Sequence, residues 1–68
     1  MPKRPSSAKI ISVLKQHGFS EISQKGSHVK FRSAEGRTAI VPHPKKEIPI
    51  GTFHSIVRQS GLNRSDFD

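Results

Sequence analysis

The sequence predicts an α+β domain whose elements follow the order helix, strand, strand, strand, helix. Three observations support this prediction. Apolar residues recur at helical spacing near each end of the chain, alternating apolar and polar residues fill the stretch between them, and glycine-containing turns break that stretch twice. A three-stranded antiparallel sheet with one apolar face can be covered on that face by two helices. We expect one domain over residues 1–68, with residues 1–5 forming a flexible N-terminal tail.

The first helix is expected over residues 7–17. Its apolar side chains recur three and four positions apart, at Ile10, Val13 and Leu14. Ser6 and Ser7 offer hydroxyl groups that can accept hydrogen bonds from the first turn. Gly18 suits the left-handed backbone conformation that commonly ends a helix.

Three strands are expected over residues 20–25, 28–33 and 37–42. Side chains alternate across a strand, so Val29 and Phe31 of the middle strand share one face. The other face of that strand carries His28, Lys30 and Arg32. The sequence therefore predicts a sheet with one apolar face and one basic face.

The final third of the chain predicts a stiff loop and a second helix. Three prolines within residues 42–49 remove amide donors and disfavour regular structure. Thr52 is the expected N-cap of the second helix, which ends at Gly61. Phe53, Ile56 and Val57 are expected to share one face of this helix. A last turn after Asn63 is expected to dock Phe67.

Composition narrows the possible functions. A chain of 68 residues without cysteine has no disulfides or thiolate zinc site, and it is too short to enclose a cofactor. No stretch is apolar enough for a signal peptide or membrane span, so we expect a cytoplasmic protein with no cofactor and no membrane partner. Residues 1–46 carry a net charge of +8, whereas residues 47–68 carry −1. This positive field favours a polyanionic partner such as nucleic acid.

The four histidines, at positions 17, 28, 43 and 54, include no pair one helical turn apart, so no metal site is predicted. His28 is the candidate catalytic residue because Lys25, Lys30 and Arg32 surround it. An imidazole titrates near neutral pH and can take the proton of a ribose 2′-hydroxyl, while cations stabilise the phosphate. His43, between two prolines, either stiffens the loop or lines the same groove.

Four motifs, in this order and spacing, resemble the HicA family of mRNA interferase toxins. They are Gly26-Ser27-His28, Val41-Pro42-His43-Pro44, Gly51-Thr52 and Gln59-Ser60-Gly61-Leu62, and the resemblance runs from about residue 8 to the end. It implies a fold like the double-stranded-RNA-binding domain, RNA cleavage with His28 as catalytic residue, and neutralisation by a cognate HicB antitoxin. Val29 departs from many relatives, which have a second histidine or another polar residue there.

Two functions are compatible with the residues and with this resemblance. The first is an endoribonuclease toxin that cleaves mRNA, and the second is a non-catalytic RNA-binding module on the same basic face. We favour the first because a binding module needs lysines but no imidazole, and Phe31 and Phe53 are expected to point inward rather than stack on bases. The expected RNA contacts are Lys25, Gly26, Ser27, Lys30, Arg32, His43, Lys45 and Lys46.

Overall fold

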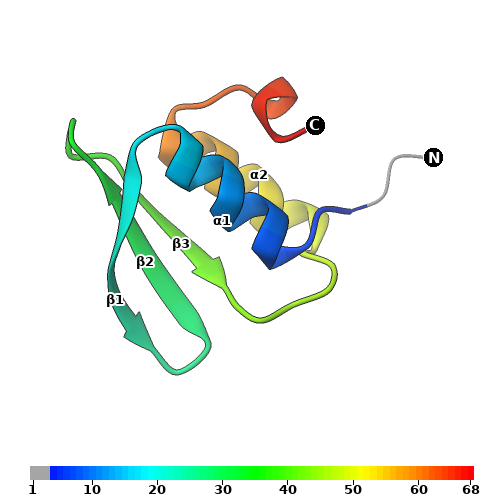
Figure 1. The fold of residues 1–68 in the computed structure, drawn as a ribbon. Helices are drawn as coiled ribbons and strands as arrows, with labels where there is room; N and C mark the ends of the chain where they lie inside the picture. Colours follow the sequence, from blue (N-terminus) through cyan, green and yellow to red (C-terminus); the bar gives the residue numbers. More distant parts are fainter. Residues whose placement is uncertain (1–3) are drawn as a thin grey trace.

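Two helices cover one face of a three-stranded antiparallel sheet in the computed structural model, which describes residues 4–68 (Figure 1). The elements are α1 (Ser7–Gln16), β1 (Phe19–Lys25), β2 (His28–Ser33), β3 (Thr38–Pro42), α2 (Ile50–Ser60) and a short 3₁₀ helix, η1 (Arg64–Phe67). The predicted α+β class and αβββα order are confirmed, and they are consistent with a fold like the double-stranded-RNA-binding domain.

The expected flexible tail falls partly outside the described residues, which begin at Arg4. Pro5 is held within the fold because its carbonyl accepts a hydrogen bond from the Ile48 amide at 2.9 Å. The chain entering α1 is therefore attached to the loop that precedes α2. Among residues 4–68, no helix combines the length and apolar character needed to cross a membrane.

The ends of α1 follow the predicted signals. Ser6 is the N-cap, and its hydroxyl oxygen accepts a hydrogen bond from the Lys9 amide at 3.1 Å. Gly18, just beyond the helix, has a φ of 87°, a conformation that glycine adopts without steric cost. Ser7 does not cap the helix; its side chain is buried and used elsewhere.

The start of α2 corrects one prediction. Thr52 is not the N-cap, because the helix already begins at Ile50 and its N-cap is Pro49, which makes no side-chain capping bond. Pro49 has an extended backbone, and its carbonyl accepts the Phe53 amide at 2.9 Å. The fixed φ of proline supplies the entry geometry that a capping side chain was expected to provide. The predicted end at Gly61 is confirmed by its left-handed φ of 73°.

β2 is the central strand, paired with β1 on one side and β3 on the other. Val29 and Phe31 point toward the helices and are buried, as predicted. They belong to a core that also includes Ile10, Val13, Leu14, Phe19, Ala39, Val41, Ile48, Phe53, Ile56 and Phe67. The neighbouring residues of β2 must then face outward.

The predicted last turn is η1, and it docks Phe67 as expected. Asn63 and Asp66 form a reciprocal capping box at its start. The Phe67 ring packs edge-on against Phe53 of α2, with ring centroids 5.5 Å apart. This contact closes the helix layer over the core.

Candidate active site

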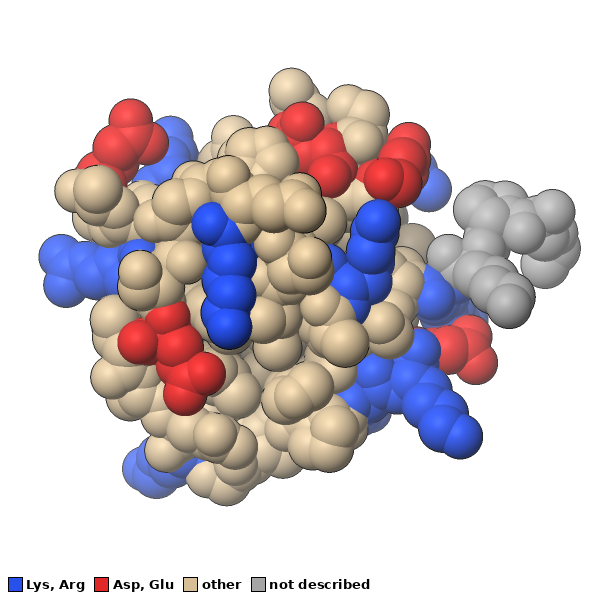
Figure 2. All heavy atoms as spheres, viewed as in Figure 1, with Lys and Arg blue, Asp and Glu red and all other residues tan. Residues whose placement is uncertain are grey.

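The outer face of the sheet is lined by basic side chains of β1 and β2. Residue pairing places Lys25 opposite His28, Ser23 opposite Lys30, and Ser20 opposite Arg32. On the other side of β2, His28 pairs with Pro42 and Lys30 with Ile40. In the view of Figure 2, basic and acidic side chains are interspersed, so net charge alone does not define one patch. The alternation of side chains along the strands therefore defines the basic face.

His28 stands at the first position of β2, directly after the turn that joins it to β1. Gly26 takes a φ of 60° in that turn, and the side-chain amide of Gln24 donates to the Gly26 carbonyl at 3.1 Å. The His28 side chain is exposed, and within residues 4–68 its ring nitrogens have no hydrogen-bond partner. Both nitrogens are therefore accessible to a ligand.

Two hollows meet at His28. The first, which we name the sheet hollow, has a volume of about 550 Å³ and is lined by Ser23, Lys25, His28, Lys30 and Ile40. The second, named the helix hollow, has a volume of about 440 Å³ and lies between β3, the following loop and α2. Its lining includes Ser27, His28, Ile40, Lys45, Thr52, Ser55 and Gln59. His28 and Ile40 line both hollows, so a ligand can occupy both while touching the imidazole.

The loop beside the helix hollow is fixed by Ser7 of α1. The Ser7 hydroxyl accepts the Lys45 amide at 2.8 Å and donates to the Lys45 carbonyl at 3.1 Å. The Ser7 backbone amide also donates to that carbonyl, at 2.9 Å. Only 1% of the Ser7 surface is exposed, so these bonds are shielded from water.

His43 belongs to the same network. Its Nδ1 lies 2.7 Å from the Ser7 hydroxyl oxygen, and its backbone amide donates to the Ser27 carbonyl at 2.7 Å. Ser27 directly precedes His28. The loop and the catalytic candidate are therefore connected through one backbone hydrogen bond, and α1 positions the loop.

The structure brings together only part of the predicted RNA-contacting set. Lys25 and Lys30 share the sheet hollow with His28, and Ser27 and Lys45 share the helix hollow with it. Arg32 lies farther along the same outer face, opposite Thr38. Gly26 shapes the turn.

His43 and Lys46 line neither hollow at His28. His43 is half-buried against α1, and both residues line a separate hollow with Ser6, Ser7 and Ala8. The sequence allows His43 either to stiffen the loop or to line the groove at His28. Its contacts fit the first of these two roles.

The residues of the two hollows that the sequence does not predict as site residues are Ser23, Ile40, Pro42, Pro49, Thr52, Ser55, Ile56 and Gln59. Thr52 is predicted as a helix cap, and Ile40 falls within the strand expected over residues 37–42. The available signal was the alternation of β3, because Ala39 and Val41 face the core and Ile40 must then face outward. No spacing rule relates Gln59 to Ile40.

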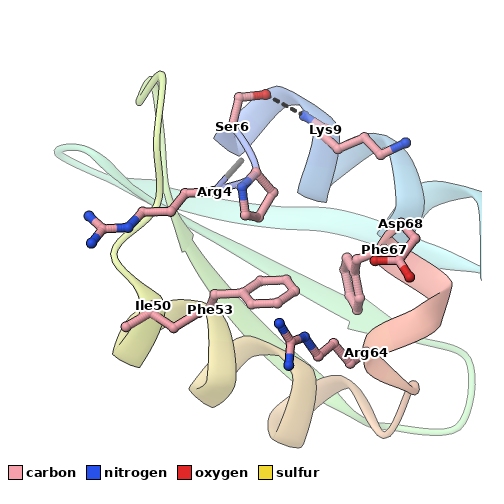
Figure 3. Close-up of a pocket in the computed structure, with 9 residues that line it drawn as sticks. Arg4, Ser6, Lys9, Ile50, Phe53, Arg64, Phe67 and Asp68 are labelled. Atoms are coloured by element: carbon pink, nitrogen blue, oxygen red, sulfur yellow. Dashed lines mark hydrogen bonds between the residues drawn. The ribbon is translucent and has the colours of Figure 1, made fainter. Parts of the chain in front are cut away.

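A further pocket, of about 320 Å³, lies away from His28, where the N-terminal segment meets α2 and η1 (Figure 3). Arg4, Lys9 and Arg64 contribute to its lining, and Figure 3 shows the rings of Phe53 and Phe67 pointing toward one another. The pocket contains no imidazole. It lacks the acid–base group that the His28 hollows share.

The described part of the chain, residues 4–68, contains no cluster of three or more histidine or acidic side chains arranged to hold a metal ion. The single ion pair between a histidine and an acid in this part joins His17 to Asp66 at 3.9 Å. That pair links the end of α1 to η1. It is a structural contact and not part of the hollows at His28.

Comparison with models of protein families identifies a family that the chain matches. The model of a family described as "HicA toxin of bacterial toxin-antitoxin" matches residues 7–62, which is most of the chain. No curated protein matches the sequence. The matched range includes β2 with His28, the loop fixed by Ser7, and all of α2.

Ser7→Ala is expected to lower the free energy of unfolding by about 1–3 kcal/mol, because it leaves the Lys45 amide and the His43 ring without their shared partner. Ser12→Ala, on the exposed surface of the same helix, is the matched control and should change it by no more than about 0.5 kcal/mol. Urea denaturation measures both. Equal midpoints for the two variants would show that the Ser7 bonds contribute nothing to stability.

Proposed function

The chain belongs to the HicA family of toxins from bacterial toxin–antitoxin systems, and we propose that it is an endoribonuclease that cleaves mRNA with His28 as its catalytic residue. The observation that carries this proposal is the position of His28, exposed at the junction of two hollows and beside two lysines. Cleavage of mRNA stops translation and growth until an antitoxin covers the site.

His28 supplies proton transfer in this mechanism. Its neutral imidazole takes the proton from a ribose 2′-hydroxyl, and the 2′-oxygen attacks the adjacent phosphorus in line with the leaving 5′-oxygen. The O2′–P bond forms as the P–O5′ bond breaks. The 5′-oxygen takes a proton from water, so the products are a 2′,3′-cyclic phosphate and a free 5′-hydroxyl.

Lys25 and Lys30 supply the electrostatic part. Both line the sheet hollow with His28, where their ammonium groups can contact the non-bridging oxygens of the phosphate. Negative charge accumulates on those oxygens as the new bond forms, so positioned cations lower the barrier. Arg32, farther along the same face, extends the contact to a neighbouring phosphate.

The alternative is an RNA-binding module that holds RNA on the same face without cutting it. One observation favours it: within residues 4–68, no side chain is hydrogen-bonded to the His28 ring to orient it. Catalytic histidines are commonly oriented by a second group. In the endoribonuclease, bound RNA itself must orient the imidazole.

A toxin of this family has an antitoxin partner. We propose an acidic protein of the HicB type that covers His28 and so excludes RNA from it, through contacts with the basic residues Lys25, Lys30, Arg32 and Lys45. A chain with a formal charge of +7 attracts a negative partner over long range. No conformational change is needed for such inhibition, because the hollows open directly to solvent.

His28→Ala is expected to reduce the RNA cleavage rate by about 10²- to 10⁴-fold, the usual effect of removing a general acid or base. RNA affinity should remain, because it depends mainly on lysine and arginine contacts with phosphate. The free energy of unfolding should change by no more than about 0.5 kcal/mol, since the side chain is exposed. Cleavage rate, RNA dissociation constant and urea midpoint are measured together.

Two control variants accompany His28→Ala. His54→Ala removes an exposed imidazole on α2 that lines neither hollow, and it should cleave at the parent rate. Lys30→Ala should weaken RNA binding and reduce its salt dependence. A His28→Ala protein that folds and cuts RNA at the parent rate would refute the catalytic assignment.

Cleavage is expected to continue in EDTA, because the imidazole performs the proton transfer and lysines carry the charge stabilisation. The measurement follows full-length RNA and its fragments by gel with and without chelator. RNA that is bound and retarded but intact under both conditions would support the binding module instead. Loss of cleavage that one particular metal restores would refute the imidazole mechanism.

Association with the acidic antitoxin is expected to slow as salt is added, because screening shortens the range of the attraction. Stopped-flow measurements between about 0.05 and 0.5 M salt span Debye lengths from more than 10 Å to a few ångströms. Lys25→Ala should reduce the slope of log rate against salt. A rate independent of salt, or a complex that leaves the sheet hollow open, would contradict the proposed partner surface.

A further inference from the structure

The helix hollow differs in chemistry from the sheet hollow beside it. The sheet hollow has two lysines, whereas the helix hollow has one cation, Lys45, and is otherwise lined by neutral groups. Thr52, Ser55 and Gln59 contribute two hydroxyls and an amide from successive turns of α2. Such groups form directional hydrogen bonds to neutral polar ligands and add no net charge.

Gln59 has a defined orientation. Its side-chain oxygen accepts a hydrogen bond from the backbone amide of Ile40 at 3.2 Å. A backbone amide can only donate, so the oxygen of Gln59 must face β3. Within residues 4–68 the side-chain NH₂ group donates to no other group of the protein, so its donors are available to the hollow. Gln59 therefore presents hydrogen-bond donors from a fixed position beside the His28 site.

Ile40 provides an apolar surface at the same place. It is one of the large hydrophobic residues that remain exposed, with 41% of its surface accessible, and it lines both hollows with His28. A planar, largely apolar ring fits against such a side chain. A phosphate gains nothing from an apolar side chain and needs cations, of which the helix hollow has one, Lys45, and the sheet hollow has two.

These observations point to one ligand chemistry, and we propose that the helix hollow binds a single unpaired nucleobase next to the cleaved bond. The base packs on Ile40, and the Gln59 amide donates to an acceptor on its edge. The phosphate lies in the sheet hollow, against Lys25 and Lys30. This proposal depends on the proposed RNA substrate and adds to it a specificity-determining residue, Gln59.

The size of the hollow agrees with this occupant. Its volume of about 440 Å³ leaves room for a ring system and not only for solvent. Proteins that read RNA sequence do so mainly on unpaired bases, through hydrogen bonds to their edges. A hollow that takes one base selects single-stranded regions, since a paired base cannot enter it.

The decisive variant is Gln59→Glu. A glutamate keeps a carboxylate oxygen that can accept the Ile40 amide, and it loses the two N–H donors that would contact the base. It also adds a negative charge, which weakens binding of every RNA alike. Gln16→Glu, the same change at an exposed position of α1, is the matched control for that charge.

Binding is measured by fluorescence anisotropy with four short homopolymeric RNAs, in a His28→Ala background that leaves them intact. We expect the protein with Gln59 to bind the four RNAs with unequal affinities. Gln59→Glu should change the ratio between the strongest and the weakest affinity by about tenfold, which is the effect of losing one good base contact. Gln16→Glu should lower all four affinities together. Equal affinities for the parent, or a ratio that Gln59→Glu leaves unchanged, would overturn the proposal.

A second measurement separates this proposal from the proposed activity. The nucleotides flanking each cut are mapped on one long RNA, using proteins with an intact His28. Altered flanking preference in Gln59→Glu supports the base site. If the parent does not cut RNA but the affinity ratios still change, the endoribonuclease assignment fails and the base site stands. If the parent cuts and Gln59→Glu changes neither preference nor ratios, the base site fails alone.

Discussion

The alternation of side chains along β2 is the constraint on which the rest of the molecule depends. β2 is bonded to a strand on each side, so its register is fixed by both pairings. Burial of Val29 and Phe31 against the helices requires His28, Lys30 and Arg32 to face outward. A shift of one residue would place the imidazole in the core and Phe31 in water, reversing both faces together. The apolar core and the basic outer face therefore have a single cause, and a chain of 68 residues obtains its candidate functional surface from the same strand that stabilises it.

A second constraint acts through Ser7, far from His28 in the sequence. Its hydroxyl and backbone amide hold Lys45, and its oxygen lies against His43, whose amide bonds to the residue before His28. A loop with several prolines has few amides to donate, so its position depends on the donors and acceptors of its neighbours. The first turn of α1 supplies them. The wall of the helix hollow formed by this loop is thus set by a helix on the opposite face of the sheet.

Sequence patterns predicted those features that depend on neighbours within a few residues. Alternation located β2, the glycines at 18 and 61 located the helix ends, and the last turn with Phe67 was recognised from its capping residues.

The features that the sequence did not predict share one cause, which is their dependence on residues far apart in the chain or on backbone geometry. Thr52 was chosen as a cap by residue type, but the position of Ile48 in the core and the backbone of Pro49 start the helix earlier. The bonds from Ser7 to His43 and from Gln59 to Ile40 span 36 and 19 positions, and no local spacing encodes them. His28 is predicted as a catalytic candidate from its cationic neighbours, whereas the helix hollow beside it exists only once α2 packs along β3.

The small size of the domain also determines the kind of site it can have. Too little chain is present to enclose a substrate, so His28 lies on an open surface between two shallow hollows. An enclosed active site gains much of its rate from excluding water and fixing its catalytic groups in advance. In an open site, the substrate itself must fix the position of the catalytic group. It can do so through phosphate contacts on one side of the imidazole and base contacts on the other. A single-stranded RNA that spans both hollows would supply these contacts together, with its 2′-hydroxyl at the junction. The same openness means that a protein able to cover this face would remove both hollows at once, so the proposed inhibition by an antitoxin requires only contact and no change in the fold of the toxin.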